Sequence, residues 1–491
     1  MIDRSSLRRA LLPGLILLLA FILRAWQLHG TGYTSDEVAE LLLTRKPIAS
    51  MLLDEDDDLF PPLYRPTVAI WIRLWRTELA ARWLNVVYGV GAVAVVLAAG
   101  RELLGKRLGW WPALFLACAP FHIHYCREGR AYALYALFAA MMFWGALRVL
   151  NHNRRGDWIL LTLSSAAAVW THYYAGPLAV VVWAVLADRE IRAGRWRALL
   201  TATAALGLLL APTPILLHRA MADHPDESLP ASFDVEALGY MYAMQALGYT
   251  VGPSMKDLRS MSAAEGIRQF LPWLAVVALT WAVLGWSAVC AIGRRRAFWL
   301  LALPTVLLIP ALGYGGNLAG VGFFYRYAAW LPIPYALLIG AGASRSVKNW
   351  LVSCAAATLI AVNLLAFYNR LYDPAYAEED FRAVATKLDE LAEPGESVVV
   401  ASHYMGQALH YYTGDSRPLA SFPIFVQFED VRQREIAEFL DTLQPGERYW
   451  IVSQWLPKDD VRRETRDAAL QRLGAVLRAE LNQTEIYEAT R

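Results

Sequence analysis

Long apolar runs separated by short polar gaps dominate the first three quarters of the chain. The first run covers Leu11–Leu28, and ten more have centres near Val90, Leu116, Ala140, Ala166, Val181, Leu208, Ala278, Leu307, Leu337 and Leu359. Each run holds roughly 17–23 residues, the length that an α-helix needs to cross a bilayer. The pattern predicts a polytopic α-helical membrane protein with about eleven transmembrane helices.

The pattern changes to that of a soluble domain after about Glu378. Two short apolar runs, Val398–Ala401 and Tyr449–Val452, follow turn residues and are typical of buried strands. Helical periodicity marks Phe381–Leu391, Val431–Leu443 and Val461–Leu477. Because helices alternate with strands, residues 373–491 are predicted to form a small α/β domain, distinct from a transmembrane domain of residues 1–372.

The gap after the first run contains two features of its own. The run Pro61-Pro62-Leu63-Tyr64-Arg65-Pro66 is predicted to interrupt any helix. Val68–Trp75 is apolar and aromatic but too short to span, so we expect a short amphipathic helix at the membrane interface. The acidic run Asp54–Asp58 is interpreted as a solvated loop.

Basic residues occupy alternate gaps, as the positive-inside rule requires. One set of gaps holds Arg4, Arg8, Arg9, Arg101, Lys106, Arg107, Arg154, Arg155, Arg189, Arg192, Arg195, Arg197, Arg294, Arg295, Arg296, Arg345 and Lys348. The other set holds Asp36, Glu37, Glu128 and Arg130. We therefore predict a multi-pass protein of the cell (inner) membrane, with a cytoplasmic N-terminus, an uncleaved first span and an extracytoplasmic C-terminal domain.

Composition supports this class of protein. Hydrophobic residues make up 57% of the chain and charged residues 18%, against roughly 45–50% and ~25% in soluble proteins. The net charge of +2 averages a basic membrane portion and an acidic tail. No basic stripe interleaved with aromatic residues suggests nucleic acid, so membrane lipids are the expected surroundings.

Neither disulfides nor a metal centre are expected from the cysteines and histidines. Cys118, Cys126, Cys290 and Cys354 all fall in or at the ends of predicted spans, where small apolar side chains pack. The i, i+2 spacing of His122 and His124 does not bring two ligands onto one helix face.

Two adjacent carboxylates, Asp36 and Glu37, follow the first run directly. A structural interpretation is available, because Ser35-Asp36 is also a good start for a helix through Val38–Leu43. The functional interpretation is a general base, since a carboxylate at the membrane surface is well placed to take a proton from a hydroxyl near a lipid-linked substrate.

Arginines on the predicted outer side are the second unusual feature. Arg130 lies in the segment 126–134, Arg326 follows Phe324-Tyr325, and Arg24 lies in the outer third of the first span. Each also has a structural interpretation as a snorkelling anchor. A cation at such depth usually has an anionic partner, and a guanidinium binds phosphate through two hydrogen bonds. These arginines are therefore candidate phosphate ligands, whereas His172 at an outer helix end is interpreted first as aromatic packing at the interface.

Four motifs occur in an order that resembles one superfamily. They are Ser35-Asp36-Glu37, Phe60-Pro61-Pro62-Leu63-Tyr64, the segment His122–Tyr132, and Arg326-Tyr327. In this order the chain resembles the integral-membrane GT-C glycosyltransferases, in the bacterial branch related to protein mannosyltransferases and lipid A aminoarabinose transferases (glycosyltransferase family 39). The resemblance extends to about Phe367. Gly129 and Ala131 depart from the usual motif, as does Arg65.

The resemblance implies a polyprenyl- or dolichyl-phosphate sugar donor and an inverting transfer to an acceptor hydroxyl outside the cytoplasm. It implies Asp36 as the base, with Glu128 and Arg130 in a second active-site loop. We further predict catalytic roles for Glu37 and Glu128, binding of the donor phosphate by Arg130, Arg326 and Arg24, and a substrate lining of His172, Tyr132 and Tyr64. The acceptor is a lipid, a glycan or a protein; no cofactor is implied, and the need for a divalent cation is left open.

Two other classes of function compete with this one. A lipid or polysaccharide transporter without catalysis would typically show internal repeats and interrupted helix pairs, and the sequence shows neither. A sensor whose external tail binds a ligand would leave the outer carboxylates and arginines without a role. The sequence thus favours a membrane glycosyltransferase.

Overall fold

The computed structural model describes residues 4–53, 61–223, 233–293, 295–319, 322–400, 403–416, 418–421, 438–454 and 461–490. Internal contacts divide the chain into two compact units. The membrane unit comprises Met1–Trp26, Lys46–Gly252 and Leu271–Tyr368, and the C-terminal unit comprises Gln27–Arg45, Pro253–Phe270 and Asn369–Arg491. Two segments distant in sequence thus group with the tail, which a single boundary at residue 372 does not describe; that boundary stays a prediction.

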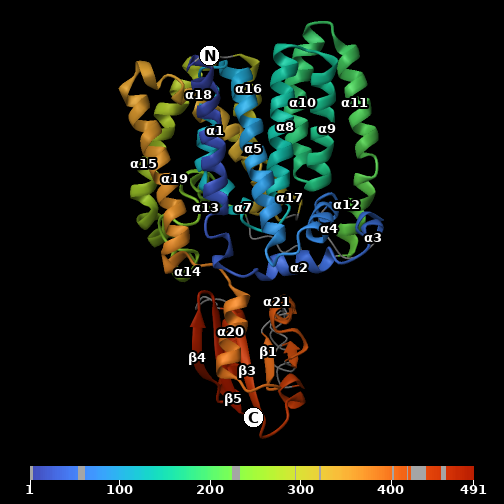
Figure 1. The fold of residues 1–491 in the computed structure, drawn as a ribbon, viewed down its shortest axis with the longest axis vertical. Helices are drawn as coiled ribbons and strands as arrows, with labels where there is room; N and C mark the ends of the chain where they lie inside the picture. The colour runs from blue at the N-terminus through green and yellow to red at the C-terminus, as the bar shows by residue number, and fades with distance from the viewer. Residues whose placement is uncertain are drawn as a thin grey trace. The chain divides into compact units, whose positions relative to one another are not determined.

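Long α-helices running side by side make up the membrane unit (Figure 1). They are α1 (Arg4–Ala25), α5 (Ala80–Leu104), α8 (Tyr132–Asn151), α9 (Arg155–Thr171), α10 (Ala175–Arg192), α11 (Trp196–Leu210), α15 (Ala263–Ile292), α16 (Arg296–Leu303), α17 (Ile309–Ala319), α18 (Pro332–Ala343) and α19 (Trp350–Tyr372). A π-helical turn, Pro304–Leu308, joins α16 to α17.

Seven helical stretches in the described part of the chain are long and apolar enough to cross a membrane. All the predicted span centres fall inside helices; the remaining ones, Leu116, Ala166, Val181 and Leu337, lie in α6, α9, α10 and α18. The predicted fold class, a polytopic helical membrane protein with a small soluble domain, is confirmed.

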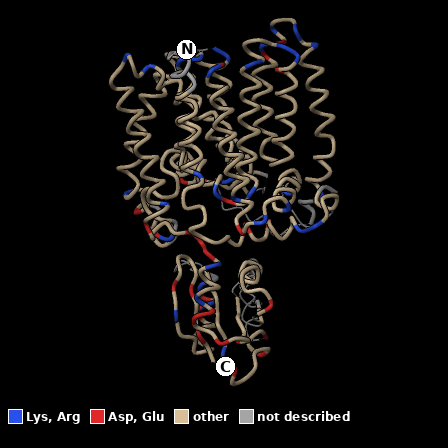
Figure 2. Tube along the Cα trace, in the orientation of Figure 1, with Lys and Arg blue, Asp and Glu red and all other residues tan. Residues whose placement is uncertain are grey.

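Large apolar side chains remain exposed along the long helices, as expected of surfaces that contact lipid. Leu208, Leu279 and Trp286 are 78%, 68% and 73% exposed. Charged residues gather mainly at the helix ends (Figure 2). The N-terminus and the turns after α8 and α10 share one end (Figure 1), where Glu190 is fully buried and accepts hydrogen bonds from Arg195. Which end faces the cytoplasm stays a prediction.

Small residues allow the helices of the membrane unit to approach closely. A Cβ atom added to Gly340 in α18 would collide with the backbone of Pro112 in α6 (Trp111–Cys118). Gly342 lies in the same way against the Leu284 carbonyl of α15. These glycines therefore set the distance between α18 and its two neighbours.

Proline positions explain where the shorter helices begin. Pro120 ends α6 and starts α7 (Pro120–Cys126), because the residue before a proline avoids helical geometry, and Ala119 is extended with ψ 113°. A short helix occurs where one was predicted, α4 (Tyr64–Leu74), and its location at the membrane interface stays a prediction. It begins earlier than expected, since Pro66 falls in its first turn, where no backbone N–H is needed. The other short helices of this unit are α3 (Ile48–Leu53), α12 (Thr213–Asp223) and α13 (Val235–Leu247).

A five-stranded sheet with order β2-β1-β3-β5-β4 forms the centre of the C-terminal unit (Figure 1). The strands are β1 (Ser397–Val400), β2 (Leu419–Ser421), β3 (Arg448–Gln454), β4 (Val476–Leu481) and β5 (Thr484–Thr490). β1 pairs in parallel with β2 and β3, whereas β5 is antiparallel to both β3 and β4. The helices of this unit are α2 (Ser35–Leu43), α14 (Met255–Ser260), α20 (Phe381–Leu391), α21 (His403–Thr413) and α23 (Val461–Arg472).

The two strands predicted in this unit are confirmed as β1 and β3, and the helix predicted over Phe381–Leu391 is confirmed as α20. The helix predicted over Val461–Leu477 is wrong at its end, because Gly474 adopts a positive φ of 59° and β4 starts at Val476. Most of the helix predicted over Val431–Leu443 lies outside the described residues, as does the acidic run Asp54–Asp58.

Candidate active site

A buried asparagine holds the loop that carries Glu128 and Arg130. Asn85, in the first turns of α5, is completely buried, and its Nδ2 donates to the main-chain oxygens of Glu128 and Arg130. The same nitrogen lies 3.1 Å from the Tyr64 hydroxyl. Arg127 also holds the loop in place, because its guanidinium donates to the Trp26 carbonyl at 2.7 Å. The sequence analysis missed Asn85, although a carboxamide inside an apolar run is the signal that marks such positions.

The Glu128 carboxylate contacts a histidine of α7. Its Oε1 lies 2.9 Å from Nε2 of His124, one helical turn earlier, and both side chains are partly exposed. The Tyr125 and Tyr249 rings contact His124 edge to face and share a 2.8 Å hydroxyl contact. Glu128 is therefore a carboxylate in a fixed, largely aromatic setting.

Arg130 and Arg326 share two neighbours, His172 and Tyr132. Both guanidinium groups lie within electrostatic range of the His172 imidazole and of the Tyr132 hydroxyl. Arg326 comes from a short 3₁₀ turn, Tyr325–Ala328, and its guanidinium lies over the Phe324 ring, 5.4 Å from the ring centroid. The structure thus brings together two predicted phosphate ligands and two predicted lining residues that are far apart in sequence.

Aromatic rings surround this pair of arginines. His172, just after the end of α9, stacks on Tyr135 at 5.0 Å and packs against Tyr327 at 5.2 Å. Tyr132 is 2% exposed, and its hydroxyl has no hydrogen-bond partner among the residues that the structure describes. A buried hydroxyl without a partner costs roughly 1–3 kcal/mol, so the Tyr132 hydroxyl is a candidate hydrogen-bond donor to a ligand.

Arg24 occupies a different environment from the other two arginines. Its guanidinium is fully buried, contacts His122 at 2.7 Å, and donates to the carbonyls of Leu116 and Ala117 at 3.1 and 3.0 Å. Pro120 has no N–H to offer the Leu116 carbonyl, which accepts instead from the Ala119 N–H at 3.3 Å and from Arg24. This geometry favours a structural role, and the predicted phosphate contact of Arg24 stays a prediction.

Asp36 and Glu37 belong to the C-terminal unit and differ in exposure. Thr34 caps α2, and Glu37 completes a capping box by accepting from the Thr34 N–H at 2.9 Å. Glu37 is fully buried in this arrangement, whereas Asp36 is exposed. The structural interpretation therefore applies to Glu37, while the Asp36 carboxylate is exposed to solvent. The catalytic roles predicted for both stay predictions.

Tyr64 and the histidines complete the inventory of predicted residues. Tyr64 is 1% exposed and serves as a partner of Asn85. His122 and His124 face different partners, Arg24 and Glu128. Across the described ranges, no group of three or more His, Cys, Asp or Glu side chains is placed to hold a metal ion.

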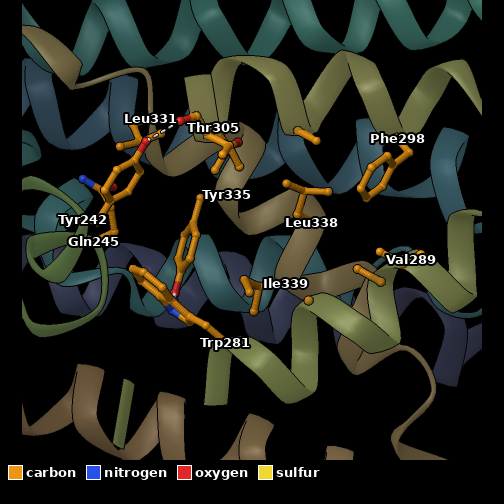
Figure 3. Close-up of a pocket in the computed structure, with 14 residues that line it drawn as sticks. Tyr242, Gln245, Trp281, Val289, Phe298, Thr305, Leu331, Tyr335, Leu338 and Ile339 are labelled. Atoms are coloured by element: carbon orange, nitrogen blue, oxygen red, sulfur yellow. Dashed lines mark hydrogen bonds between the residues drawn. The ribbon is translucent and has the colours of Figure 1, made fainter. Parts of the chain in front are cut away.

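The membrane unit also contains an apolar cavity of about 490 Å³ (Figure 3). Its walls come from α13, α15, α16, α18 and the π-helical turn, and include Trp281, Phe298, Tyr335 and Leu338. The volume lies within the range of small-molecule sites. Gln245 is the notable polar lining residue: it is 2% exposed, and its Oε1 has no partner within the described structure.

Comparison with known proteins gives one family model and several structures. Residues 61–218 match the model of the dolichyl-phosphate-mannose-protein mannosyltransferase family. The structure of ArnT from Cupriavidus metallidurans bound to undecaprenyl phosphate is similar over 99% of this chain and 98% of that chain, with a TM-score of 0.58 and 13% identity. The apo oligosaccharyltransferase of Archaeoglobus fulgidus is similar over 91% of this chain and 69% of that one, with a TM-score of 0.53 and 12% identity. No curated protein matches the chain in sequence.

Proposed function

Because the chain has the GT-C fold of integral-membrane glycosyltransferases, we propose that it transfers a sugar from a polyprenyl-phosphate donor to an acceptor hydroxyl on the extracytoplasmic face. The observation that carries the proposal is that Arg130 and Arg326 both lie within electrostatic range of Tyr132, whose buried hydroxyl has no hydrogen-bond partner in the described structure. Two guanidinium groups and a hydroxyl donor match the oxygens of a phosphate diester.

The proposed donor site assigns a task to each of these groups. Arg130 and Arg326 bind the phosphate, and Tyr132 donates a hydrogen bond to one of its oxygens. As the sugar–phosphate bond breaks, negative charge grows on the leaving oxygen, and the fixed cations stabilise it. Glu128, oriented by His124, is proposed to hydrogen-bond hydroxyl groups of the transferred sugar.

Asp36 is proposed to act as the general base. The acceptor oxygen forms a bond to the anomeric carbon while its proton passes to the Asp36 carboxylate. The bond between the anomeric carbon and the phosphate oxygen breaks, and the electron pair leaves with polyprenyl phosphate. A single displacement of this kind inverts the anomeric configuration.

The lipid part of the donor also has a suitable environment. ArnT binds undecaprenyl phosphate in a structure of the same fold. In this chain, the cavity between α13, α15, α16 and α18 has walls that suit a hydrocarbon chain (Figure 3). This cavity is one reason to propose a lipid-linked donor over a water-soluble one.

The direct test uses the purified full-length protein with radiolabelled polyprenyl-phosphate hexoses and pentoses and a panel of lipid, glycan and peptide acceptors. Transfer of label to an acceptor, with release of polyprenyl phosphate, is the expected result. A transporter would move the intact donor between leaflets of a vesicle without cleaving it. Intact donor across the whole panel, with movement between leaflets, would contradict the proposal.

Tyr132→Phe should weaken donor binding without destabilising the protein. The change removes a hydroxyl that has no partner in the described structure, while a hydrogen bond to charged phosphate is worth roughly 1.5–3 kcal/mol, or about ten- to hundredfold in affinity. Undecaprenyl phosphate binding to the purified protein measures the effect. Tyr135→Phe is the matched control, because the Tyr135 hydroxyl is also buried without a described partner. Equal affinities for both variants would remove Tyr132 from the site.

Accessible cysteines test the predicted orientation of the chain. After replacement of the exposed Cys290 and Cys354 by serine, Thr386→Cys in α20 should react with a membrane-impermeant maleimide in intact cells. Val347→Cys, at a position 90% exposed between α18 and α19, should react only after the membrane is permeabilised. The opposite labelling pattern would place the C-terminal domain in the cytoplasm and contradict an extracytoplasmic acceptor.

A further inference from the structure

The segment Gln27–Arg45, which carries Asp36, belongs to the same compact unit as the C-terminal tail Asn369–Arg491, although the two are far apart in sequence. α2 packs against α21, and the segment from Gln27 to Arg45 forms part of the same compact unit. The contacts that join them are specific and concentrated just before Asp36.

Two consecutive backbone N–H groups of the segment bind side chains of the C-terminal domain. Gly32 donates to Asp380 Oδ1 at 2.9 Å, and Tyr33 donates to the Tyr412 hydroxyl at 2.6 Å. A Cβ atom on Gly32 would lie 2.5 Å from Cβ of Arg382 and 2.8 Å from the Asp380 carboxylate, so only glycine fits there. The chain is therefore fixed immediately before the N-terminus of α2.

Glu379 makes the contact nearest to Asp36. Its Oε2 accepts from the Ser35 hydroxyl at 3.0 Å, and its Oε1 accepts from Nε2 of Gln454, at the end of β3, at 2.7 Å. Burial raises the pKa of the Glu379 carboxyl above its ordinary value, and the neighbouring charge of Asp36 contributes to the rise. Glu379 thus bridges the sheet and the first residue of α2, within electrostatic reach of Asp36.

We infer that Glu379 is a positioning residue for transfer: through Ser35 it holds the first turn of α2 on the C-terminal domain and so orients Asp36. This inference rests on the proposed role of Asp36 as base. It also gives the C-terminal domain a function in catalysis, because the domain supplies Glu379, Asp380, Tyr412 and Gln454. Removal of the contact misplaces the base without altering the groups proposed to bind donor phosphate.

Two substitutions separate hydrogen bonding from charge. Glu379→Gln keeps both positions bonded, because the amide oxygen accepts from Ser35 and the amide nitrogen donates to the side-chain oxygen of Gln454 once that amide rotates. This variant should stay close to the wild-type turnover. Glu379→Ala removes both bonds and should lower kcat on the order of ten- to hundredfold, the cost of a misplacement of about 1 Å, with KM for donor unchanged.

Hydrogen exchange measures the anchoring independently of activity. In full-length protein in detergent, Glu379→Ala should speed amide exchange in the peptides covering residues 29–43, and Glu379→Gln should not. Ser35→Ala should also speed exchange in these peptides. The double variant Ser35→Ala/Glu379→Ala should exchange no faster than Glu379→Ala alone, because the two substitutions remove the same contact. Glu396→Ala is the matched control, because Glu396 bonds Trp450 inside the same domain.

The outcomes divide clearly. Unchanged exchange in Glu379→Ala, or faster exchange with unchanged kcat, overturns the inference, as does an equal loss of activity in Glu396→Ala. The proposed function fails by a different result, which is wild-type turnover in Asp36→Asn. In that case the exchange data still decide whether Glu379 holds α2, and only its link to a base is overturned.

Discussion

Asp36→Asn should abolish detectable sugar transfer while leaving donor binding intact. An amide has the shape of the carboxylate but does not accept the proton of the acceptor hydroxyl, and loss of a general base costs typically 10²- to 10⁴-fold in rate. Single-turnover transfer from a radiolabelled donor measures the chemical step, and undecaprenyl phosphate binding measures the donor site. Unchanged donor affinity is expected, because the proposed phosphate ligands come from the membrane unit.

Glu37→Gln is the matched control for Asp36→Asn. Glutamine at this position still accepts from the Thr34 N–H, so the capping box and α2 are retained. Its transfer rate should stay near that of the wild type. Turnover in Asp36→Asn comparable to that of Glu37→Gln would show that Asp36 is not the base.

Arg130→Ala and Arg326→Ala should each weaken donor binding and slow transfer. A charge-assisted contact to a partly buried phosphate is worth roughly 1.5–3 kcal/mol, or about ten- to hundredfold. Arg130→Lys should remain impaired, because lysine keeps the charge and loses the two-pronged geometry that matches phosphate. An arginine that merely anchors a helix end would tolerate lysine.

Kinetics distinguish the ways in which these arginines act. If affinity falls and the single-turnover rate holds, the arginine binds ground-state donor; if the rate falls and affinity holds, it acts on the leaving phosphate. Arg101→Ala, at an exposed position in the last turn of α5, is the control for loss of one positive charge. If donor affinity and single-turnover rate both keep their wild-type values in Arg130→Ala and Arg326→Ala, the proposed phosphate site is contradicted.

The long helices and two strands were predictable because hydrophobic periodicity alone determines them. The runs centred on Val90 and Ala140 have the length that the bilayer requires, and the strand over Val398–Ala401 is a continuous apolar run between turns. β4 was not predictable in this way. Its residues are all exposed or half-buried, and its pairing with β5 is a tertiary property that a helical pattern through Gly474 concealed.

The start of α2 was predicted at Ser35-Asp36 and not at Thr34. Thr34 and Glu37 have the spacing of a capping box, and this signal was readable in the sequence. The contact between Ser35 and Glu379 joins residues 344 positions apart. No local pattern predicts such a contact, because it depends on how β3 and the start of α20 present their side chains.

The buried guanidinium of Arg24 has a consequence for the order in which the protein is made. Pro120 divides one apolar run into the two short helices α6 and α7. An interrupted helix in hydrocarbon leaves carbonyl groups that need hydrogen-bond donors from elsewhere. Those donors come from α1, through the bonds of Arg24 to Leu116 and Ala117. Because synthesis begins at the N-terminus, α1 is already in the bilayer when the interrupted segment emerges. The first helix therefore supplies hydrogen-bond donors to the interrupted segment, which would be costly to leave without them in lipid.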